Sequence, residues 1–117
     1  MTEEMIKNNG YIKALHQKQQ SILDSMDKND LVYLDVYSAY RNNNEEEFGK
    51  ILLEKEEEYI KLKNKLNKNM ESSSMKKRFF FKKARQKMLD IEFTKTYNEL
   101  KHLEKTICVY YTYYDKM

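Results

Sequence analysis

The segment 89–114 has the sequence LDIEFTKTYNELKHLEKTICVYYTYY, and its regular pattern decides the fold. Its seam residues recur at spacings of four and three without a slip: Leu89, Phe93, Thr96, Leu100, Leu103, Ile107, Tyr110 and Tyr114. These spacings place side chains along one face of an α-helix. We therefore expect one long helix in which this seam packs against another helix.

A second apolar stripe precedes that helix and predicts its partner within the chain. Over residues 45–70 it comprises Phe48, Leu52, Lys55, Tyr59, Leu62, Leu66 and Met70. Asn44 is suited to cap the start of this helix, because its side chain can accept a hydrogen bond from a free backbone N–H. The polar run Glu71-Ser72-Ser73-Ser74 resembles a linker, so we expect a turn over 71–75, with Ser73 or Ser74 capping the last helix. The fold class predicted is all-α: an antiparallel helical hairpin of residues 45–70 and 76–114.

The residues before this hairpin predict two further elements. Residues 3–27 carry a helical apolar pattern and predict one N-terminal helix, after which Asp30 can cap the next element. Residues 31–41, LVYLDVYSAYR, suit a strand by composition and a helix by the spacing of their tyrosines. We favour a helix, because only 108–114 offers a pairing strand and a lone hairpin is marginal. This Tyr-rich segment is expected to pack, with the N-terminal helix, on the open end of the long hairpin.

Length and composition limit the other classes. The 117 residues suit a single domain over 1–117, and the absence of proline with only two glycines disfavours an all-β fold. A single cysteine, Cys108, excludes an internal disulfide framework and suits a reducing compartment. The N-terminus resembles no secretory signal, and no apolar run is long enough to span a bilayer. We expect an intracellular protein, cytoplasmic or nuclear.

Positive charge is concentrated in residues 61–87, called the basic segment below. It holds eleven basic residues and one acidic residue, Glu71, although the whole chain carries only +3. If the chain reverses within this segment, both of its arms lie at one end of the hairpin, where mutual repulsion favours an anionic partner. The candidate polyanion-binding residues are Lys61, Lys65, Lys68, Lys76, Lys77, Arg78, Lys82, Lys83, Arg85 and Lys87.

Two polyanions suit this segment. RNA, alone or in a ribonucleoprotein, is favoured, with the lysines on phosphates and Phe79, Phe80 and Phe81 stacking on unpaired bases. An anionic membrane surface is the alternative, with the same aromatic triplet inserted at the interface. Lysine outnumbers arginine, which favours phosphate attraction over base reading. The plainer interpretation is a solvated lysine-rich turn or a docking site for an acidic protein.

A different function is also open, in which the seam assembles protein partners. Its candidate contact residues are Leu89, Phe93, Leu100, Leu103, Ile107, Tyr110 and Tyr114. On this hypothesis the chain is a structural or adaptor coiled coil, and we expect a protein partner or a homo-oligomer.

Catalytic chemistry is not predicted. Glu99 and His102 have the Glu-x-x-His spacing of di-metal helical bundles, but the second such pair is missing. Cys108 lies six residues from His102, which on a helix points the thiol away from the imidazole. We expect no enzyme, no metal, no cofactor and no small-molecule substrate.

Overall fold

The computed structural model describes residues 1–77 and 83–117, with the side chains of 69–90 excepted. Every regular element in the described residues is a helix: α1 (Glu3–Lys7), α2 (Gly10–Ser25), α3 (Leu31–Asn42), α4 (Glu45–Lys77) and α5 (Lys83–Tyr114). The prediction of an all-α fold built on a long hairpin is confirmed.

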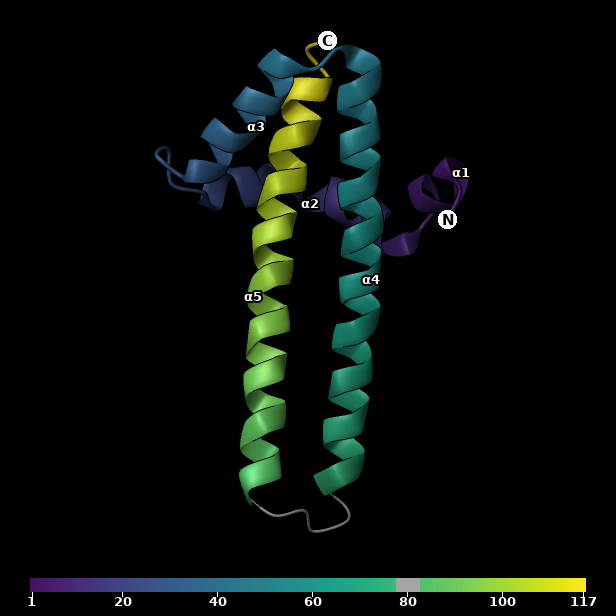
Figure 1. The fold of residues 1–117 in the computed structure, drawn as a ribbon, viewed down its shortest axis with the longest axis vertical. Helices are drawn as coiled ribbons and strands as arrows, with labels where there is room; N and C mark the ends of the chain where they lie inside the picture. The colour runs from purple at the N-terminus through teal and green to yellow at the C-terminus, as the bar shows by residue number, and fades with distance from the viewer. Residues whose placement is uncertain (78–82) are drawn as a thin grey trace.

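The two long helices α4 and α5 lie side by side and antiparallel (Figure 1). Helix α2 crosses behind both of them in this view. It connects α1, which lies beside α4, to α3, which lies beside α5. The three short helices therefore gather around the half of the hairpin that holds the C-terminus. The other half consists of the end of α4 and the start of α5 alone.

The helices begin where short polar side chains cap them. The Thr2, Asn9, Asp30 and Asn44 side chains accept hydrogen bonds from the backbone N–H groups of Met5, Tyr11, Val32 and Glu47. Such a cap satisfies an N–H that the helix leaves free, and it contributes about 1 kcal/mol. The caps predicted at Asp30 and Asn44 are confirmed.

The core is formed where the seam of α5 meets α4 and the short helices. Leu100, Leu103, Ile107 and Tyr110 are all buried, together with Phe48, Leu52 and Ile60 of α4, Ile12 and Leu15 of α2, and Val32 and Val36 of α3. The apolar faces thus cover one another within this one chain.

Two predicted boundaries were wrong. The N-terminal helix is divided into α1 and α2, because Asn9 caps a new helix at Gly10. Asparagine competes well for a cap position and glycine is a weak interior residue, so the chain breaks there.

The turn expected over 71–75 was also wrong, since α4 continues to Lys77 and includes Ser73 and Ser74. Serine lowers helix propensity only slightly, and no glycine or proline stands there to stop the helix. The connection therefore falls at 78–82, outside the described residues.

The segment 31–41 is helical, as favoured, and its tyrosines pack on the C-terminus as expected. The ring centroids of Tyr37 and Tyr40 lie 6.1 and 5.1 Å from that of Tyr113. Phe48, fully buried, lies 4.9 Å from Tyr110. This aromatic cluster fixes the end of the molecule opposite the basic segment.

Candidate nucleic-acid interface

The backbone brings both arms of the basic segment to the same end of the hairpin. Helix α4 ends there at Lys77 and α5 begins there at Lys83 (Figure 1). Lys76 and Lys77 occupy helical positions on one arm, and Lys83, Arg85 and Lys87 occupy helical positions on the other. The side chains of these five residues, and the whole of Arg78, Phe79, Phe80, Phe81 and Lys82, lie outside the described part of the chain.

The described lysines of α4 differ in their surroundings. Lys65 and Lys68 are exposed. Lys61 forms an i,i+4 ion pair with Glu57 at 3.4 Å, so part of its charge is used within the chain. Lys63, half-buried, holds its ammonium about 6 Å from the ring centroids of Tyr11 and Tyr59. The exposed pair is therefore the described part best placed to meet a polyanion.

Helix α4 is electrically divided along its length. Glu45, Glu46 and Glu47 form its first turn, and the lysines begin at Lys50 and dominate after Lys61. Acids near the N-terminus and bases near the C-terminus both suit the helix macrodipole. At about 1.5 Å per residue, the acidic first turn lies tens of ångströms from the C-terminal end of the helix. The acids of this turn are therefore too distant to neutralise that end.

An aromatic pair on α5 was not anticipated from the sequence. The rings of Phe93 and Tyr97 are nearly parallel, with centroids 6.3 Å apart, and the Lys101 ammonium lies 5.3 Å from the Tyr97 centroid. Phe93 is half-buried against the core, whereas Tyr97 is 42% exposed. The four-residue spacing of 93, 97 and 101 was the available signal, because such residues share one side of a helix.

The 89–114 seam is largely occupied by the chain itself. Leu100, Leu103, Ile107 and Tyr110 are buried, Phe93 is half-buried, and Tyr114 is 37% exposed. The Leu89 side chain lies outside the described part. A protein partner on the buried part of this seam would have to displace α2, α3 or α4.

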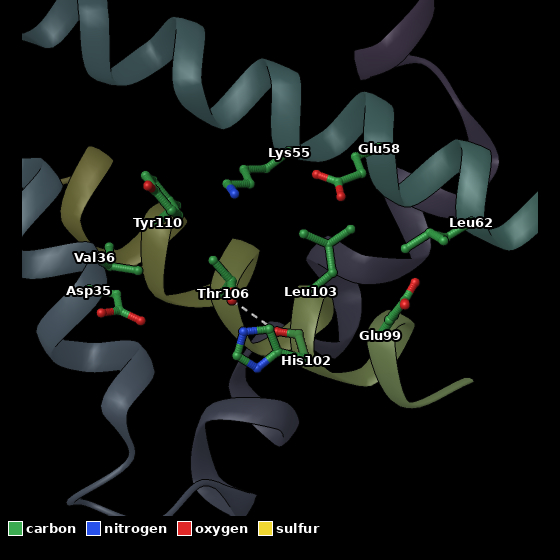
Figure 2. Close-up of a pocket in the computed structure, with 10 residues that line it drawn as sticks. All are labelled: Asp35, Val36, Lys55, Glu58, Leu62, Glu99, His102, Leu103, Thr106 and Tyr110. Atoms are coloured by element: carbon green, nitrogen blue, oxygen red, sulfur yellow. Dashed lines mark hydrogen bonds between the residues drawn. The ribbon is translucent and has the colours of Figure 1, made fainter. Parts of the chain in front are cut away.

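A hollow of about 300 Å³ lies between α3, α4 and α5 (Figure 2). Half-buried Lys55 points into it, and Glu99 and His102 stand on its α5 side. Asp35 and Glu58 add two further carboxylates. Charges of both signs thus line the hollow, and this mixture does not identify a charge for a ligand.

Two buried hydrogen bonds join the long helices inside the core. Tyr59 of α4 donates to Glu104 of α5 at 2.8 Å, and Tyr111 of α5 donates to Glu56 of α4 at 2.7 Å. Both carboxyl groups are buried, with Glu56 only 3% exposed. A shift of one helix along the other would leave both carboxyl groups without these donors, so the two bonds fix the pairing of α4 with α5.

Burial also raises the pKa values of two buried groups on these helices. It raises the pKa of the Glu56 carboxyl above its usual 4.5, while the Tyr111 hydroxyl and His16 oppose that rise. Burial, with the nearby Glu104 charge, raises the pKa of the Cys108 thiol to about 12. Because a thiolate is the nucleophilic form of cysteine, the raised pKa favours the protonated, less nucleophilic form of this thiol at neutral pH.

Replacing Glu56 with glutamine tests this buried charge. The folded chain holds the Glu56 proton more tightly than the unfolded chain, so the stabilisation is present below pH 4.5 and is lost as the pH rises through the raised pKa. Glu56→Gln removes that loss and keeps an acceptor for Tyr111. We expect the melting temperature of Glu56→Gln, measured by circular dichroism, to rise relative to that of the wild type as the pH increases from 4.5 to neutrality.

The matched variant Tyr111→Phe keeps the carboxylate and removes its donor. It should destabilise the fold by about 1–3 kcal/mol. A melting temperature of Glu56→Gln that falls relative to the wild type as the pH rises from 4.5 to neutrality would contradict an unfavourable buried charge.

Three observations complete the description of the site. Among the described side chains, no three His, Cys, Asp or Glu residues gather as metal ligands would. None of the described helices combines the length and the apolar character needed to cross a bilayer. Models of known protein families, curated proteins and solved structures yield no match to this chain.

Proposed function

We propose that this chain is a non-enzymatic helical binding protein that attaches to RNA, or to a ribonucleoprotein particle, through the basic segment 61–87. The observation that carries the proposal is the antiparallel arrangement of α4 and α5. It brings the basic residues of α4 and those of α5 to one end.

Charge separation supports the proposal. The packed half of the molecule contains the acidic first turn of α4 and the short helices, whereas the basic segment has one acid among its 27 residues. Like charges held together in this way repel, and phosphate groups relieve the repulsion. The stability cost of such an arrangement is consistent with a surface that is used by a polyanion.

The type of basic residue supports contact with the RNA backbone. Nine of the eleven basic residues in the segment are lysines, and the other two are Arg78 and Arg85. Lysine acts as a point charge on phosphate, and arginine is the residue that reads bases in a bidentate manner. We therefore propose affinity for the strand with little preference for its sequence.

The salt dependence of binding tests this function. For a single-stranded RNA, the logarithm of the binding constant should fall linearly with the logarithm of salt concentration, by about 0.7 per phosphate contacted. With about six contacts the slope is near −4. Fluorescence anisotropy with a labelled RNA, between about 50 and 200 mM salt, measures it.

Binding that does not respond to salt, or no binding to RNA, would overturn the proposal. A parallel titration with vesicles containing phosphatidylserine separates it from the membrane alternative. Binding to those vesicles in the absence of any RNA binding would assign the basic segment to a lipid surface instead.

A further inference from the structure

We infer that the RNA bound by this chain is single-stranded along α5, where an unpaired base stacks on Tyr97 and the strand continues over Ile91 toward the basic segment. This inference rests on the proposed function and deepens it. It names a second contact surface, the α5 stacking face, defined here as Ile91, Thr94, Tyr97, Asn98 and Lys101.

The stacking face lies between the two halves of the molecule. Residues 91–101 follow the first turns of α5 and precede the region that α2 and α3 cover (Figure 1). Ile91 is 67% exposed and Tyr97 is 42% exposed. Large apolar side chains are thus left open to solvent beside a strongly basic end, where one partner can reach both.

The geometry of Tyr97 suits stacking. Its ring is nearly parallel to that of Phe93, which the core anchors, so the aromatic platform has a fixed base. Lys101 holds its ammonium 5.3 Å from the Tyr97 centroid. The same ammonium pairs with the Glu104 carboxylate at 3.4 Å, which keeps it beside the ring, and the Lys101 side chain is 50% exposed, which leaves it open to a phosphate. The ring face and the ammonium can then bind a base and its phosphate together.

The charged positions of α5 are divided between two sides of the helix. The helical period of 3.6 residues puts positions 83, 87, 94, 98 and 101 on one side of the helix, with Asp90 as the acidic position there. Glu92 and Glu99 fall on the opposite flank from Tyr97 by the same period. Lysine positions 83 and 87 therefore lie on the side of the basic segment, Lys101 lies at the far end of the stacking face, and the uncharged Thr94 and Asn98 stand between them.

The aromatic contact selects for unpaired bases. In a duplex the flat faces of the bases are covered by their neighbours, and a protein reaches mainly phosphates and sugar hydroxyls. In a single strand the faces are free, and a base stacked on an aromatic side chain contributes about fivefold to a hundredfold in affinity. The stacking face should therefore add affinity for a single strand and none for a duplex.

The experiment compares two RNA probes by fluorescence anisotropy at one salt concentration. One is a labelled oligouridine of about 16 nucleotides, and the other is a blunt duplex with the same number of phosphates. Tyr97→Ala should weaken binding of the oligouridine about fivefold to a hundredfold and leave duplex binding within about twofold. Tyr97→Phe should bind as the wild type does, and Tyr97→Leu should behave as the alanine variant, because it keeps apolar volume without a ring.

The matched control is Tyr37→Ala. Tyr37 is 44% exposed, close to Tyr97, and it lies on α3 at the packed end of the molecule. This variant should bind both probes as the wild type does. Thermal melting of every variant, followed by circular dichroism, verifies that the fold is retained.

The outcomes separate the inference from the proposed function. If the wild type binds neither RNA, the proposed function and this inference both fail. If it binds both probes with a steep salt dependence and Tyr97→Ala binds oligouridine unchanged, the inference is overturned and the proposed function stands. Equal losses on both probes would also overturn it, because a stacking contact cannot act on a duplex.

Discussion

Leu100→Asp is expected to unfold this protein. Leu100 is 1% exposed and lies in the middle of the seam, where α5 meets α4. Removing a buried leucine costs about 3–5 kcal/mol, and a carboxylate left there without a partner adds to that cost. A domain of this kind has about 5–15 kcal/mol of stability in total. Far-ultraviolet circular dichroism should show loss of helix, and sedimentation should show an expanded or aggregated chain.

Asn98→Asp is the control, because it places the same charge two residues away on the exposed side of α5. Its stability should stay within about 0.5 kcal/mol of the wild type. The pair also tests the adaptor hypothesis. A Leu100→Asp chain that keeps its helices and merely changes from an oligomer to a monomer would show that the seam serves a protein partner.

Reversing four charges in the basic segment is expected to abolish RNA binding. The variant replaces Lys76, Lys77, Lys82 and Lys83 with glutamate, and it removes four candidate phosphate contacts while adding four repulsive charges. At about 0.7 per contact, the remaining salt slope should be shallower by about 3. Anisotropy with the oligouridine probe should give an affinity at least about a hundredfold weaker, because each lysine on a phosphate contributes to a summed electrostatic attraction.

A matched variant reverses Lys13, Lys18, Lys28 and Lys116, which are exposed in the packed half of the molecule. It alters the net charge of the chain by the same amount. If net charge alone governed binding, both variants would lose it equally, and the basic segment would have no special role. Retention of most of the affinity by the second variant is the result we expect.

The two surfaces named on α5 depend on one property of its pattern. The seam residues Leu100, Leu103 and Ile107 turn inward, whereas Tyr97 and Lys101 turn outward. Near the C-terminus α2 and α3 cover part of the outer side, but around residues 91–101 they do not. The same helix thus supplies core in one half and an exposed aromatic surface in the other.

Periodicity and capping chemistry are local properties, and the sequence by itself determined what depends on them. The seam of α5, the stripe of α4, and the caps at Asp30 and Asn44 could all be identified in the residues. Clustering of positive charge over 61–87 is likewise a property of the chain order alone.

Tertiary structure decided which helix faces pack against one another. Only packing could show that α2 crosses both long helices, that Tyr59 and Tyr111 donate to Glu104 and Glu56, and that Lys63 is held by two aromatic rings. It also decided that the chain itself covers the seam from Leu100 to Tyr110 and that Tyr97 is left open. Spacing along a helix fixes the direction of a side chain, but burial depends on residues distant in the sequence, and their arrangement is set by the free energy of the whole packed core.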